Sequence, residues 1–153
     1  MAFFIGCEKK IDLSSQEPYL QAIGKSFVLQ QDYYVYTIRG STHTYLGEDF
    51  WLPKQIDSKY IGFDNSEVKI LGIAKKGVAI KIKKILLEEN IESSYDYYFV
   101  SLDNDFLSRY GDLDVSGFLN SFHNPPTTKT WSDPPIFDPK VALPLPSDGI
   151  WWK

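Results

Sequence analysis

The chain has 153 residues, of which 43% are hydrophobic, and its mean hydropathy is −0.25. These values favour a single globular domain and argue against a disordered or membrane-spanning chain. The formal net charge of −4 argues against a nucleic-acid-binding protein, because neutralising phosphates requires a clustered basic surface. The single cysteine excludes a disulfide within the chain.

The chain begins with apolar residues that lead to a small residue and a cysteine, Phe4-Ile5-Gly6-Cys7. This start resembles a bacterial lipobox, in which the cysteine receives a lipid. Only six residues precede Cys7, whereas a secretory signal has a basic start and an apolar stretch of about 7–15 residues. Two interpretations stay open. Either Met1 lies inside a longer reading frame and Cys7 anchors a periplasmic lipoprotein to a membrane, or the match is accidental and Cys7 is a buried residue of a cytoplasmic protein.

Residues 1–23 are expected to form a leader, with a helical turn after Pro18. From residue 24 onward the chain alternates apolar and polar residues, which is typical of β-strands. This alternation predicts strands over 24–31, 33–39 and 43–52, the last interrupted at Gly47-Glu48-Asp49. The mixed polarity of residues 53–67 predicts a loop.

The clearest strand pattern lies in the middle of the chain, and it predicts strands over 68–74, 77–87 and 95–103. In the second of these, Lys84 falls where an apolar residue is due. A β-bulge at Lys83-Lys84 restores the inward face. A helix over 80–89 is the weaker alternative, because its acidic end opposes the helix dipole. Since the connections are short, the three strands are expected to form an antiparallel meander.

Four aspartates follow these strands: Asp103, Asp105, Asp112 and Asp114. Their spacing lacks the D-x-D-x-D-G loop and the distant glutamate of an EF-hand, so we prefer turns and helix caps to a calcium site. Asp114 or Ser116 is expected to cap a short helix that runs through Phe118 to Phe122.

The composition changes at residue 124, where prolines break regular structure but large apolar residues are spread among them. We expect residues 124–153 to be an ordered, extended strap docked on a barrel domain of residues 24–123. The alternative is a disordered tail that orders on a partner.

Catalytic signatures are absent from the sequence. His43 and His123 are the only histidines, and the chain has no C-x-x-C, H-E-x-x-H, G-x-S-x-G or Gly-rich phosphate loop. We therefore expect no metal site, no cofactor and no catalytic residue, and surface or turn positions for both histidines. The paired carboxylates of a hydrolase stay open, because their separation is set only in three dimensions.

The run from Gly24 to Asp103 resembles a bacterial SH3-like barrel, with 24–29 and 33–36 as its opening pair and 68–82 as its hairpin. With the lipobox-like start and the ending Ser147-Asp-Gly-Ile-Trp-Trp-Lys153, the chain resembles small envelope lipoproteins of Gram-negative bacteria. Some of these are immunity partners of secreted antibacterial toxins, for example those delivered by type VI secretion. The resemblance implies a mainly β chain, with a single SH3-like antiparallel barrel, a short helix and a Pro-rich C-terminal strap.

We therefore expect a non-enzymatic envelope protein that binds a protein partner, with a secreted toxin as the preferred one and no nucleic acid. A peptidoglycan-binding SH3-like module and a carboxylate-dependent hydrolase are the alternatives. Aromatic residues dominate binding hot spots. The contacts are accordingly assigned to Tyr33, Tyr34, Tyr36, Trp51, Tyr98, Trp151 and Trp152, and lipid attachment to Cys7.

Overall fold

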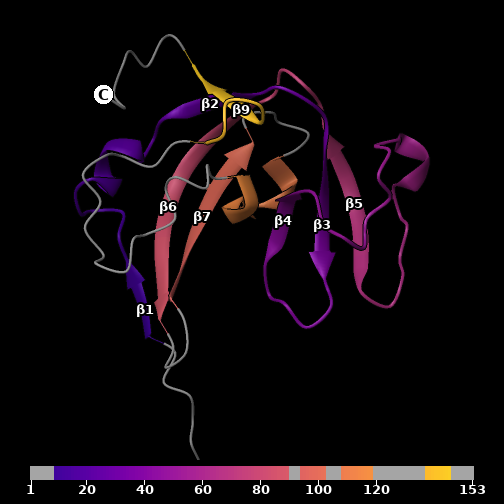
Figure 1. Cartoon of the computed structure of the whole chain (residues 1–153), viewed down its shortest axis with the longest axis horizontal. Coiled ribbons are helices and arrows are strands. Elements are labelled where there is room, and N and C mark those ends of the chain that lie inside the picture. Colours follow the sequence, from indigo (N-terminus) through magenta and orange to yellow (C-terminus); the bar gives the residue numbers. More distant parts are fainter. Residues whose placement is uncertain (1–8, 90–93, 103–107, 119–136, 146–153) are drawn as a thin grey trace, which may run out of the picture.

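The computed structural model describes residues 9–89, 94–102, 108–118 and 137–145. Within these ranges the chain is mainly β, as predicted, and nine strands form one sheet that curls into a half-barrel (Figure 1). The strands are β1 (Lys9–Asp12), β2 (Ser26–Leu29), β3 (Tyr33–Ile38), β4 (Thr44–Gly47), β5 (Val68–Ala74), β6 (Ala79–Glu89), β7 (Ser94–Leu102), β8 (Leu113–Asp114) and β9 (Ala142–Pro144).

Short 3-10 helices connect some of the strands: η1 (Tyr19–Ala22), η2 (Ser58–Tyr60), η3 (Ser108–Tyr110) and η4 (Ser116–Phe118). None of the helices in the described ranges has the length and apolar character needed to cross a membrane.

Hydrogen-bonded neighbours follow the order β5-β3-β4-β8-β7-β6-β2-β9, and β1 pairs separately with β6. Figure 1 shows the long strands β6 and β7 in one half of the sheet and β3, β4 and β5 in the other. The short strand β8 joins the two halves, because it pairs with β4 in parallel and with β7 antiparallel.

Two long segments of the chain run through both halves of the sheet. Val28 of β2 pairs with Ala79 of β6, and Tyr33 of β3 pairs with Ala74 of β5. Val28 and Tyr33 are five residues apart, and so are Ala74 and Ala79. The pairing register between the two segments is therefore the same on either side of the bend. The segment β2–β3 and the segment β5–β6 are therefore two bent strands that belong to both halves.

The bend itself is held by hydrogen bonds between the two segments. Asp32 Oδ1 accepts the backbone N–H of Lys76 at 2.7 Å. The N–H of Gly77 donates to the carbonyl of Leu29 at 2.9 Å, with Gly77 at a φ of +91° that suits glycine. The connection between β5 and β6 thus carries the chain around a corner.

This corner corrects one prediction for the centre of the chain. The strands lie close to their predicted positions, and β6 and β7 pair antiparallel as expected. The predicted bulge is also confirmed, since the β6–β7 register shifts between Ile82 and Lys84. However, β5 pairs with β3 rather than with β6, so the three strands do not form a meander.

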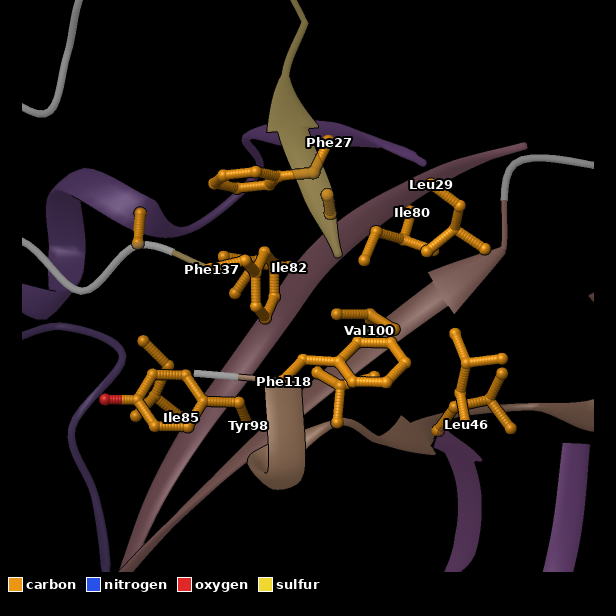
Figure 2. Packing of buried hydrophobic residues seen from close by; sticks show 14 of the residues in the cluster. Phe27, Leu29, Leu46, Ile80, Ile82, Ile85, Tyr98, Val100, Phe118 and Phe137 are labelled. Atoms are coloured by element: carbon orange, nitrogen blue, oxygen red, sulfur yellow. The ribbon is translucent and has the colours of Figure 1, made fainter. Parts of the chain in front are cut away.

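The main core lies inside the curled sheet. The inward residues of β6, Ile80, Ile82 and Ile85, are fully buried there. Phe27 of β2 meets Phe137 edge to face, with ring centroids 4.6 Å apart, and both belong to the same cluster (Figure 2). Phe137 and β9, which pairs with β2, come from the predicted C-terminal strap, so its described part, 137–145, lies on the sheet.

The other end of the chain also joins the sheet. The described part of the expected leader, residues 9–23, contributes β1, which pairs with β6. It also contributes Tyr19 and Ala22 of η1, which are buried in the main core. The turn expected after Pro18 is confirmed as η1. These residues are part of the folded unit.

A second core cluster lies on the opposite face of β3. Because successive side chains of a strand point to opposite faces, Tyr33 and Val35 enter the main core while Tyr34 and Tyr36 enter this second cluster. Leu52, from the loop after β4, is buried in the same cluster. The strand β3 is therefore covered on both faces, and the second cluster fixes the loop that forms the candidate site.

Candidate functional site

Four of the tyrosines expected to contact a partner are buried. Tyr33, Tyr34, Tyr36 and Tyr98 each have at most 4% of their surface exposed. This corrects the assignment of their rings to a contact surface. The alternation of β3 was visible in the sequence, but the loop that covers its second face was not.

The aromatic surface lies instead on the loop after β4. Phe50 is 89% exposed and Trp51 is 51% exposed, and their rings meet edge to face with centroids 5.2 Å apart. Trp51 was among the predicted contact residues, whereas Phe50 was missed. Its signal was present, since two acidic residues and two aromatic residues follow one another where the strand pattern is interrupted.

Buried tyrosine hydroxyls anchor this loop from beneath. The Tyr36 hydroxyl donates to the carbonyl of Glu48 at 3.3 Å, where the loop begins. The Tyr34 hydroxyl donates to the carbonyl of Gln55 at 2.7 Å and accepts the N–H of Asp57 at 3.2 Å. These bonds hold both ends of the segment 48–57.

The middle of the loop is a tight turn. Asp49 accepts the N–H of Trp51 with its carboxylate at 3.0 Å and the N–H of Leu52 with its carbonyl at 3.1 Å. The first of these is the Asx-turn bond by which aspartate stabilises turns. With Leu52 buried behind them, Phe50 and Trp51 are directed outward from a fixed base.

An acidic, aromatic cleft of about 160 Å³ lies beside the loop. Tyr36 and Tyr45 are cross-strand partners whose rings stack with centroids 5.5 Å apart, and both line it. Glu48 and the buried Asp114 line the same cleft. Glu48 therefore belongs to both the loop and the cleft.

The carboxylates around the cleft act on its tyrosines. Burial raises the pKa of Tyr36, and Asp49, Tyr45, Asp114 and Glu48 raise it further. Burial also raises the pKa of Tyr33, against the lowering effect of its hydrogen bond with Gln31. Both phenols are consequently neutral at physiological pH.

Asp114 and His43 form a pair that the sequence did not reveal. His43 Nδ1 lies 2.9 Å from Asp114 Oδ2, and the parallel pairing of β4 with β8 brings together these residues, 71 positions apart. Asp114 also accepts the N–H of Ser116 at 2.9 Å and bonds its hydroxyl just before η4. The helix expected here was to continue to Phe122, and residues 119–122 lie outside the described ranges. His43 is only partly exposed, between Asp114 and the edge-on ring of Phe99.

The carboxylate of Asp114 orients the imidazole ring of His43 through the contact at Nδ1. The Ser116 hydroxyl bonds Asp114 itself, and the Ser41 hydroxyl bonds the Tyr45 hydroxyl at 2.7 Å and accepts the backbone N–H of His43 at 3.1 Å. The described contacts of the pair thus join β4 to β8 and support one wall of the cleft.

Of the remaining residues singled out in the sequence, Asp112 lies within the described ranges and six others do not. Asp112 lies 3.4 Å from Lys83 and 3.8 Å from Lys84 in surface ion pairs, and the described residues contain no cluster of three or more metal-ligating side chains. Six of the residues singled out in the sequence lie outside the described ranges: Cys7, Asp103, Asp105, His123, Trp151 and Trp152.

No family model, curated protein or solved structure matches the chain.

Proposed function

We propose that this chain is a non-enzymatic binding protein that holds a basic protein partner through the loop Glu48–Trp51. One observation carries the proposal: Phe50 is 89% exposed at the tip of a loop whose base is fixed by buried tyrosines. A stable domain gains nothing from exposing such a side chain to water, whereas an interface uses aromatic side chains as anchors.

The anchoring of the loop favours binding because it reduces the conformational entropy lost on association. The charge of the loop indicates the kind of partner. Glu48 and Asp49 precede the two aromatic residues, and the chain has a net charge of −4. A basic partner would be attracted to this surface during encounter and would find opposite charges around the aromatic anchors.

The class of partner comes from the resemblance alone. The proposal is that the chain is an SH3-like envelope lipoprotein of the immunity type, anchored through Cys7 and neutralising a secreted toxin. Trp151 and Trp152 keep their proposed role in contacting that partner.

The experiment is to purify the full chain with the protein encoded beside it and to measure the affinity by calorimetry. We expect a complex that the double substitution Phe50→Ala with Trp51→Ala weakens by about 1,000-fold, because each of two hot-spot residues is worth about 2 kcal/mol and about 1.4 kcal/mol is tenfold in affinity. Leu143→Ala is the matched control, since it removes a half-exposed apolar side chain from β9.

Three results would contradict the proposal. One is the absence of a complex at micromolar concentrations. Another is a double variant that binds like the wild type while its circular dichroism is unchanged. The third is retention of the chain on purified peptidoglycan without any protein partner, which would favour the cell-wall alternative.

A further inference from the structure

The cleft beside the loop has a shape and a lining of its own. Tyr36 and Tyr45 supply stacked rings on one side, and Phe118 occupies the space next to Gly47. A Cβ atom on Gly47 would lie 2.9 Å from the Phe118 ring, so the absence of a side chain at this position lets the ring approach. The cleft is thus lined by aromatic rings from β3, β4 and η4.

The charge of the cleft is negative. Glu48 and Asp114 line it, and no lysine or arginine is among the described residues around it. The ion pairs of lysines in the described ranges lie elsewhere, at Asp32 and at Asp112. Within that part of the chain, Asp114 is hydrogen-bonded to His43, and Glu48 is in no ion pair.

The size of the cleft limits its ligand. A volume of about 160 Å³ is well below the roughly 300–1,000 Å³ of pockets for small molecules, so one side chain suits it better than a metabolite. A cation is attracted to the faces of tyrosine rings and to a carboxylate. Arginine satisfies both demands better than lysine, because its planar guanidinium stacks on rings and offers parallel N–H donors to a carboxylate.

We infer that the cleft receives one arginine side chain, with its guanidinium against the partly exposed ring of Tyr45, which the buried Tyr36 backs, and its N–H groups on Glu48. This inference rests on the proposed function for the source of the arginine, which is the partner held by Phe50 and Trp51. Glu48 connects the two, because its carbonyl accepts the Tyr36 hydroxyl and the residue lines the cleft two positions before Phe50.

The test uses the isolated full chain, so it does not depend on any partner. N-acetyl-L-arginine amide is titrated into ¹⁵N-labelled protein, and N-acetyl-L-citrulline amide, which has the same shape without the charge, is titrated in parallel. We expect the arginine probe to bind about ten-fold more tightly than the citrulline probe. The amide shifts should centre on Tyr45, Gly47, Glu48 and Gly117.

Two variants sharpen the test. Glu48→Gln is expected to abolish the difference between the probes, while Glu67→Gln, which removes the same charge outside the cleft, leaves it unchanged. Equal affinities for the two probes, shifts centred elsewhere, or equal effects of the two variants would each overturn the inference.

The partner complex then separates this inference from the proposed function. If Phe50→Ala with Trp51→Ala abolishes the complex but retains arginine-probe binding, both ideas stand. If a complex forms through the loop and Glu48→Gln does not weaken it, the arginine cleft is wrong while the proposed function survives.

Discussion

The hydroxyl of Tyr34 donates a hydrogen bond to the carbonyl of Gln55 across 2.7 Å, although 21 residues separate the two. A residue of the sheet core thereby fixes a surface loop. The ring of Tyr34 is buried in the second cluster, and its hydroxyl also accepts the N–H of Asp57. Core packing and loop order are therefore two functions of one side chain.

Replacing Tyr34 with phenylalanine should separate these functions. Tyr34→Phe keeps the ring and removes two hydrogen bonds to the loop, so we expect a loss of about 1–2 kcal/mol in the free energy of unfolding. Urea denaturation measures this loss, and faster hydrogen exchange at the Asp57 amide reports the loop directly. Tyr60→Phe is the control, because the described contacts of Tyr60 involve its ring. Equal losses in the two variants would contradict the anchoring role.

The C-terminal strap should contribute to stability through Phe137. Phe137→Ala removes a fully buried ring that packs on Phe27, and we expect it to cost about 3–5 kcal/mol. Leu143→Ala, on the exposed side of β9, is expected to cost less than about 1 kcal/mol. Thermal and urea unfolding of both variants would measure the difference. A Phe137 variant as stable as the wild type would show that the strap is dispensable for the fold.

Gly72 is required because Tyr110 occupies the position of its absent side chain. A Cβ atom on Gly72 would lie 2.1 Å from the Tyr110 hydroxyl, which itself donates to the carbonyl of Leu71 at 3.2 Å. Gly72→Ala should therefore destabilise the protein by about 1–3 kcal/mol. In a double-mutant cycle with Tyr110→Ala, measured in urea, the two losses should be less than additive. Gly117→Ala is the matched control, because nothing lies within 4 Å of its Cβ position.

Alkaline pH should destabilise the fold through the buried phenols. Burial raises the pKa of Tyr36 and Tyr33 above the ordinary value of 10.0. Above that pH the unfolded state loses these protons before the folded state does. The contribution of these two phenols to the free energy of unfolding is consequently constant below about pH 10. Above that pH it falls by at most about 1.4 kcal/mol per pH unit for each phenol.

Tyr36→Phe tests the origin of this slope. The variant lacks one of the two shifted phenols, so its stability should fall less steeply than that of the wild type between about pH 10 and pH 11.5. Urea midpoints measured across this range would show it. Parallel slopes would mean that Tyr36 does not titrate differently in the two states.

Much of the sheet was predictable because it depends on local alternation. The side-chain period of a strand is two residues. The alternating isoleucines therefore predicted β6, and the interruption of that alternation at Lys84 predicted its bulge. The pairing of β5 with β3 was not predictable in this way, because a short connection can either reverse the chain or turn a corner. The capping hydrogen bonds of Asp32 at that corner are tertiary contacts.

The candidate site shows the same division. Aromatic density pointed to β3 and to Trp51, but the sequence has no signal for which tyrosines a distant loop will cover. Leu52 is buried in one cluster with Tyr34 and Tyr36, whereas Phe50, two residues earlier, is exposed, so packing rather than residue type decides which side chains lie inside. The His43–Asp114 pair depends on the parallel contact between β4 and β8, which no local pattern encodes.

The two bent strands have a further consequence for how the molecule melts and forms. The segments β2–β3 and β5–β6 run through both halves of the sheet. Neither half can therefore unfold without breaking backbone hydrogen bonds that continue into the other half. Denaturation should be a single all-or-none event, with far-ultraviolet dichroism and tryptophan emission changing together. Refolding should be slow, on the order of milliseconds to seconds, because positions as distant as Tyr33 and Ala74 must find one another first.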